Sequence, residues 1–164
     1  MTKQEQISLL DADLAQHRGI LSAEEENRYI ELIAESYGEG EDESPVSLEL
    51  IKLHKILLLK IYDQSDAVNS FTIGGRTMWI DYNLRNDYTL KVQSAQRQGI
   101  QTVPFLGQNL PVDTAIAMLD AVNIYAMQCS GVTEAHEAAI NALDTIEAVD
   151  AYDYTTGYPE KLNF

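Results

Sequence analysis

The chain has 164 residues, with 26 acidic and 11 basic side chains, a formal net charge of −15 and a single cysteine. This length fits one domain, or one domain with a helical appendage, that folds without a metal or a disulfide. The acidic balance argues against nucleic acid as a partner, because the surface repels phosphate.

The expected compartment is a reducing cytoplasm. A lone cysteine cannot form an internal disulfide, so the sequence shows no sign of an oxidising compartment. The first residues, MTKQEQ, lack the apolar run of a signal peptide, and the apolar run at 56–59 is bounded by Lys55 and Lys60. We therefore expect neither export nor membrane insertion.

Two helices are predicted at the start of the chain. Apolar residues recur at helical spacing over residues 3–16, and Gly19 follows as a stop signal. Residues 22–25, Ser-Ala-Glu-Glu, form a capping box that predicts a second helix ending at Gly38.

A third helix is predicted from Ser44, as N-cap, to about Val68, with Pro45 in its first turn. Its apolar stripe is wide, so we expect the central helix of an N-terminal helical module, residues 1–69. The acidic segment 39–43 before it offers carboxylates to a hard cation but lacks the residue order of a calcium-binding loop. We interpret this segment as a solvated loop.

The apolar period changes from helical to alternating at residue 70. Residues 71–73 and 76–80 flank Gly74-Gly75, the pair that a two-residue hairpin turn requires. Asp81 is predicted to cap a helix over 82–98. A second hairpin is predicted from 102–106 and 110–112 around residues 107–109, with its prolines on edge strands.

Two further helices are predicted before residue 151, capped by Asp113 and Thr133. Alanines dominate their apolar stripes, so we expect an antiparallel pair joined by residues 130–132. The order of elements predicts an α+β fold, mostly helical, in which residues 70–151 form an α+β domain.

Residues 152–164 form an aromatic tail where most chains fray. Large aromatic side chains with polar tips suit protein contacts, and a Gly/Pro pair favours a turn over a helix. The tail is predicted to dock either on a neighbouring copy or on the core of its own subunit. The predicted interaction residues are Tyr152, Tyr154, Tyr158, Pro159 and Phe164.

Residues that could carry chemistry lack a supporting pattern. His17, His54 and His136 lie far apart without a neighbouring cysteine or paired histidine, so no zinc site is predicted. Cys129 with His136 could form a nucleophile and base, but Cys129 falls on an apolar helical stripe, where a buried thiol is common.

The remaining polar candidates have structural explanations. Asp81 and Asp87 are explained by capping and solvation, and core packing is favoured over ligand stacking for Trp79. Residues 73–76 lack the Lys-Ser/Thr of a phosphate loop. A glycan-cleaving enzyme would need a carboxylate pair with a supporting motif. We predict no enzyme activity and no catalytic, cofactor-binding or metal-binding residue.

A series of short motifs in the second half of the chain resembles a phage and prophage family of uncharacterised domains, typically encoded beside tail-fibre genes. The resemblance covers about residues 70–151. The ending YDYTTGYP resembles the variant found in phages and prophages of gut Bacteroides-type bacteria. The motifs are Phe71-x-Ile73-x-Gly75-Arg76-x-x-Trp79-x-Asp81-x-x-x-Arg85, Val103-Pro104-Phe105, Leu110-Pro111-Val112, Ala117-Met118-Leu119 through Tyr125, and His136-x-x-x-Ile140.

This resemblance implies a non-enzymatic structural protein of a tailed phage, a fibre-type or fibre-anchoring subunit located in the virion after assembly in the host cytoplasm. The expected partners are further copies of the chain and other phage structural proteins, with no cofactor, nucleic acid or membrane. Residues 1–69 are then expected to serve attachment or oligomerisation. The alternative is a tail-fibre assembly chaperone that is absent from the mature particle.

Overall fold

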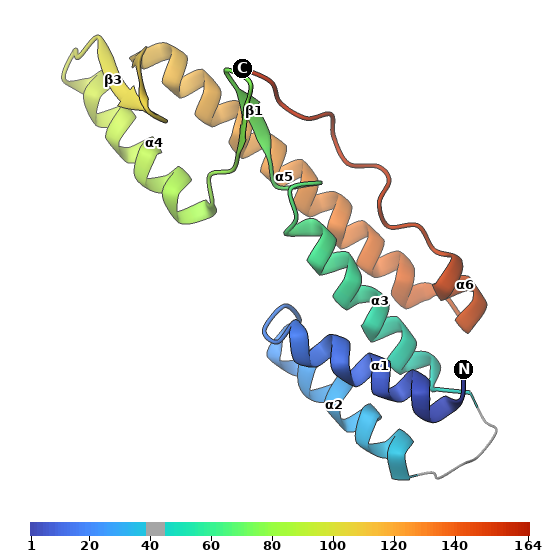
Figure 1. Ribbon diagram of the computed structural model, residues 1–164. Coiled ribbons are helices and arrows are strands. Elements are labelled where there is room, and N and C mark those ends of the chain that lie inside the picture. Colours follow the sequence, from blue (N-terminus) through green and yellow to red (C-terminus); the bar gives the residue numbers. More distant parts are fainter. Residues whose placement is uncertain (39–44) are drawn as a thin grey trace. The chain divides into compact units, whose positions relative to one another are not determined.

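The computed structural model describes residues 1–38 and 45–164, and these residues fall into two compact units. The first unit contains Met1–Ser65 and Gly131–Gly157, and the second contains Asp66–Ser130 and Tyr158–Phe164. The described residues form helices α1 (Lys3–Gln16), α2 (Ala23–Gly38), α3 (Leu48–Asp63), α4 (Tyr82–Arg97), α5 (Val112–Ala142) and α6 (Ile146–Ala151), and strands β1 (Phe71–Ile73), β2 (Arg76–Met78), β3 (Thr102–Phe105) and β4 (Gln108–Pro111) (Figure 1). The predicted α+β, mostly helical fold is confirmed.

The division into units differs from the expected domain organisation. Sequence analysis assigned residues 70–151 to one domain, whereas residues 131–151 cluster with the N-terminal helices. Ile140 of α5 and Val149 of α6 are fully buried in the same core as the apolar residues of α1, α2 and α3. The burial of these two residues explains the difference, because apolar burial determines which segments fold together.

The helices of the first unit begin at polar caps. Thr2 and Glu5 form a capping box at α1, and the predicted capping box at α2 is present between Ser22 and Glu25. Helix α3 is capped by Ser47, whose side chain accepts a hydrogen bond from Leu50 N. The predicted cap Ser44 and the acidic segment 39–43 lie outside the described residues.

The apolar pattern predicts that helix α3 ends near Val68, but the helix ends at Asp63. Just beyond the helix, Ser65 donates a hydrogen bond from its Oγ to the main-chain oxygen of Tyr62 at 2.6 Å. Serine side chains that bond to nearby main-chain groups compete with helix continuation. The chain therefore leaves the helix before the apolar run is complete.

The second unit contains two short antiparallel hairpins. Strands β1 and β2 pair around Gly74-Gly75, with φ angles of +53° and +78°, as predicted. Strands β3 and β4 pair Phe105 with Gln108, so the turn consists of Leu106 and Gly107 rather than residues 107–109. Both turn residues have positive φ, as a two-residue turn of this type requires, and Leu106 adopts it despite its side chain.

The prediction of two antiparallel helices after the second hairpin is wrong. Helix α5 runs without interruption from Val112 to Ala142, and Asp113 lies inside its first turn. The supposed breaker Gly131 is helical, and glycine inside a helix costs only about 1 kcal/mol relative to alanine. The supposed cap Thr133 instead donates from its hydroxyl to a carboxylate oxygen of Asp63 at 2.7 Å.

A continuous α5 predicts that Gly131→Ala stabilises the protein. The glycine lacks a positive φ, and a Cβ there would meet nothing within 4 Å. The free energy of unfolding should therefore rise by roughly 0.5–1 kcal/mol in urea denaturation. Gly75→Ala is the matched control and should destabilise, because alanine is strained at φ +78°. A loss of stability in Gly131→Ala would contradict the continuous helix.

Tyr29 predicts a loss of stability at high pH. Burial, reinforced by the carboxylates of Asp13 and Asp11, raises its pKa well above the ordinary value, and its hydroxyl donates to Leu10 O at 2.9 Å. Above about pH 10 the unfolded chain loses this proton while the folded chain keeps it, so stability falls as pH rises. Urea denaturation should show a shallower alkaline decline in Tyr29→Phe. An identical decline in both proteins would contradict the assignment.

Candidate interaction site

The predicted interaction residues are divided between the two units. Tyr152 and Tyr154 lie in the first unit, while Tyr158, Pro159 and Phe164 lie in the second. All except Phe164 are partly buried, and Phe164 is 38% exposed. The aromatic tail thus contacts its own chain, and docking on a neighbouring copy stays a prediction.

His136 holds the first part of the tail. Its Nδ1 lies 2.7 Å from the Tyr152 hydroxyl and its Nε2 lies 2.8 Å from the main-chain oxygen of Thr156. Because a carbonyl only accepts, Nε2 is the donor to Thr156, and Nδ1 of a neutral ring accepts from Tyr152. The two rings also meet edge to face, with centroids 5.6 Å apart. Both ring nitrogens are therefore used to position the tail.

We call the two hydrogen bonds of His136 to Tyr152 and Thr156 the histidine clasp. Tyr154 is held by other contacts. Its ring lies edge to face on Tyr62, with centroids 5.9 Å apart, and the Nζ of Lys55 lies 5.5 Å from its ring centre. Burial raises the pKa of Tyr154 above its ordinary value. Asp153 accepts hydrogen bonds from the hydroxyl and amide of Thr155, which lower its pKa.

Residues 158–164, hereafter the tail segment, lie against β1 of the second unit (Figure 1). A parallel bridge pairs Asn163 with Thr72. Thr72 N donates to Leu162 O at 3.0 Å, and Phe164 N donates to Thr72 O at 2.8 Å. The ring of Phe164 meets Phe71 edge to face at 5.7 Å. The tail segment therefore extends the β1–β2 hairpin as a parallel third strand.

Lys161 anchors the tail segment through its side chain. Its Nζ donates to the main-chain oxygens of Asp66 and Val68 at 2.9 and 2.8 Å and to the hydroxyl of Ser70 at 2.9 Å. The same Nζ lies 5.8 Å from the ring centre of Tyr125, within cation–π distance. Burial lowers the pKa of Lys161. We call the surface formed by β1, the oxygens of Asp66, Val68 and Ser70, and the ring of Tyr125 the tail site.

Sequence reasoning missed both anchors, Lys161 and His136. The interaction residues were predicted from their aromatic side chains. Aromatic side chains indicate contact area, but they do not indicate which polar groups hold a segment in register. Lys161 lies between Glu160 and Leu162, and no local signal marks a lysine whose acceptors are main-chain oxygens far away in the sequence.

The other chemical candidates have structural partners. Cys129 is buried in the second unit. Asp81 accepts from Leu84 N as the N-cap of α4, and Asp87 pairs with Lys91 at 2.6 Å. Trp79 packs near Phe71 and Tyr125 in the second unit. These contacts support the structural interpretation of the tryptophan and of both aspartates.

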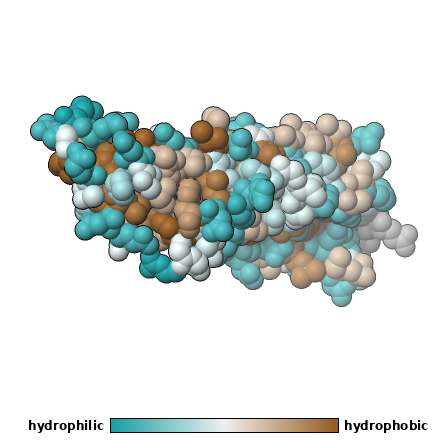
Figure 2. Space-filling view, turned by 90° about the horizontal axis from the view of Figure 1, so that it is seen from above, coloured by the Kyte–Doolittle hydropathy of each residue, from teal (hydrophilic) through white to brown (hydrophobic). Residues whose placement is uncertain are grey.

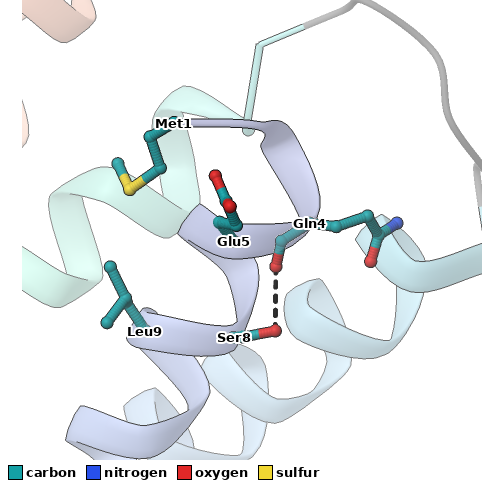
Figure 3. Close-up of a pocket in the computed structure, with 5 residues that line it drawn as sticks. All are labelled: Met1, Gln4, Glu5, Ser8 and Leu9. Carbon is teal, nitrogen blue, oxygen red and sulfur yellow. Dashed lines mark hydrogen bonds between the residues drawn. The ribbon is translucent and has the colours of Figure 1, made fainter.

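A shallow pocket of about 590 Å³ lies at the start of α1. Its lining consists of Met1, Gln4, Glu5, Ser8 and Leu9, shown in Figure 3. The polar groups there serve the helix, because the Glu5 carboxylate accepts from Thr2 N and the Ser8 hydroxyl donates to Gln4 O. This arrangement offers an apolar rim but no pair of groups set up for proton transfer.

Two further properties of the described residues concern metals and membranes. Within residues 1–38 and 45–164, no group of three or more His, Cys, Asp or Glu side chains could hold a metal ion. Helix α5 is long and apolar enough to cross a membrane by length and composition alone, and 28% of its most apolar 18-residue window is buried. Core helices of globular units meet the same test, and Ala115, Leu119 and Val122 of α5 are buried in the core of the second unit.

The histidine clasp predicts local release of the tail. His136→Leu removes both hydrogen bonds, so amide hydrogen exchange over residues 153–157 should accelerate by roughly tenfold, which corresponds to about 1–1.5 kcal/mol. His17→Leu is the matched control, because that ring bonds to Asp13 O in its own helix. Equal exchange rates in both variants would show that His136 does not hold the tail.

Comparisons of the chain with protein-family models, with curated proteins and with solved structures found no match. The resemblance of residues 70–151 to the phage family therefore stays a prediction.

Proposed function

We propose that this chain is a non-enzymatic structural protein of a tailed phage particle, a fibre-type or fibre-anchoring subunit that acts through protein contacts. The phage assignment rests on the family resemblance of residues 70–151. The contact role is supported by one structural observation, the large apolar side chains exposed on the second unit.

Several exposed apolar residues of the second unit lie on α4 and α5. Leu90 of α4 is 64% exposed, and Ile124 and Met127 of α5 are 53% and 67% exposed. Figure 2 shows apolar residues at the surface, interspersed with hydrophilic ones. Large apolar side chains at a surface favour contacts with other proteins, since burying them releases ordered water.

The net charge of −15 fits a role in a multi-protein assembly of this kind. High net charge keeps free copies soluble before assembly. Arg85 of the second unit contributes to structure, since it donates to Ile80 O at 2.7 Å and lies over Trp79. This use of Arg85 favours a contact surface based on apolar burial rather than on a free basic patch.

The proposal predicts that the chain is present in purified particles of the encoding phage. Quantitative mass spectrometry of density-purified particles should find it at a fixed ratio to the major capsid protein. Absence from particles together with abundance in the infected-cell lysate would overturn the structural role and favour the assembly chaperone.

A second experiment locates the contact surface. Met127→Glu in the phage genome should lower incorporation into particles, because a charge would be buried in the contact. Leu9→Glu is the matched control, since Leu9 is 58% exposed in the first unit. Loss of incorporation in Leu9→Glu alone would place the contact on the first unit instead.

A further inference from the structure

We propose that the tail site is an exchangeable binding site, and that in oligomers of this chain it is occupied by residues 158–164 of a second copy. In the single chain the same site holds its own tail segment. The inference goes beyond the proposed function, because it depends only on the tail site and not on a phage particle.

The first argument is that the tail site is complete within the second unit. The groups that receive the tail segment are the main chain of β1, the oxygens of Asp66, Val68 and Ser70, and the rings of Phe71 and Tyr125. All of them belong to residues 66–130. The same contacts therefore form whichever copy supplies the segment, which is the condition for exchange of identical elements between protomers.

The second argument is the mode of binding. An extended segment that adds a strand to a sheet gains affinity from main-chain hydrogen bonds, and side-chain pockets supply specificity. Here the bonds join Thr72 to residues 162 and 164, and Gly74 N donates to Phe164 O at 3.1 Å. Lys161 sets the register, because its ammonium group reaches acceptors on both Asp66 and Val68. A second copy carries this lysine and its neighbours at the required spacing.

The third argument is the connection to the first unit. Residues 153–157 contain no helix or strand, and all but Tyr154 are exposed. Gly157 has a φ of +82°, a conformation that glycine can leave at little cost. Fully extended, this connection spans about 17 Å, at up to ~3.5 Å per residue. A change at a few exposed residues is therefore enough to direct the tail segment toward another copy.

Charge determines the conditions for exchange. The tail segment carries Glu160 and Lys161 and is close to neutral, whereas each copy carries a net charge of −15. Repulsion between copies opposes the exchanged dimer, and salt screens it. The exchanged form should therefore increase with both protein concentration and ionic strength.

The test uses single-cysteine partners in the full-length chain. Thr72→Cys and Asn163→Cys are made in separate proteins, one labelled with heavy nitrogen, and mixed overnight at high concentration and high salt before mild oxidation. The bridge pairs these two positions, so a mixed-isotope disulfide between them is expected. The native Cys129 stays in place because it is buried.

Two tail variants show whether the tail site causes the disulfide. Lys161→Met in the Asn163→Cys protein removes the ammonium anchor and should lower the mixed disulfide by roughly tenfold, as expected for lost charge-assisted hydrogen bonds. Glu160→Gln is the matched control at the exposed neighbouring residue and should leave the yield unchanged. Equal losses in both variants would contradict the anchor.

The double variant Thr72→Cys/Asn163→Cys completes the test. A disulfide within this single chain, without any mixed disulfide between the separate proteins at any concentration, would overturn the exchange. Failure of the double variant to form a disulfide would overturn the tail site itself, because the two cysteines would then not be paired as the bridge requires.

Discussion

The second unit depends on a third strand that comes from the far end of the chain. Strands β1 and β2 each have three residues, and an isolated hairpin of this size is marginal in water. The tail segment adds main-chain hydrogen bonds to the open edge of β1 and places Phe164 against the buried Phe71. It also covers an edge that would otherwise be a template for pairing with other chains.

The ammonium group of Lys161 makes this third strand specific. After α3 the chain turns without regular structure, and the main-chain oxygens of Asp66 and Val68 accept from Lys161 as well as from Ser70 and Tyr125. Removing part of the lysine side chain from water costs free energy, as the lowered pKa reflects, and its hydrogen bonds offset that cost. Lys161 also fixes the register, because a shift by one residue would leave the charge without acceptors.

Local signals in the sequence predicted most of the elements. The apolar spacing over residues 3–16, the capping box at Ser22 and the Gly74-Gly75 turn act over short stretches, and they place α1, α2 and the first hairpin correctly. Gly131 shows the limit of such signals. A glycine and a threonine in sequence look like a helix boundary, yet burial of Ile140 in the core of the first unit outweighs the small cost of a helical glycine.

The candidate site was predicted only in part, for a related reason. The aromatic residues of the tail are visible in the sequence, but Tyr154 and Phe164 pack on Tyr62 and Phe71 in the first half of the chain. Lys161 likewise bonds to Val68 across 93 residues. A single sequence contains no local record of such contacts. His136 illustrates this, since its role follows from two partners, 16 and 20 residues ahead, that only the fold brings to its two nitrogens.

The two anchors differ in a way that bears on assembly. His136 bonds to Tyr152 and Thr156 in the part of the tail that belongs to the first unit, whereas Lys161 holds a segment whose receiving groups all belong to the second. Exchange of the tail segment therefore moves the groups that Lys161 holds, and the connection at residues 153–157 takes a new path. Such an arrangement gives an oligomer identical contacts to those of the single chain, so concentration and salt, rather than new complementary surfaces, determine which form is present.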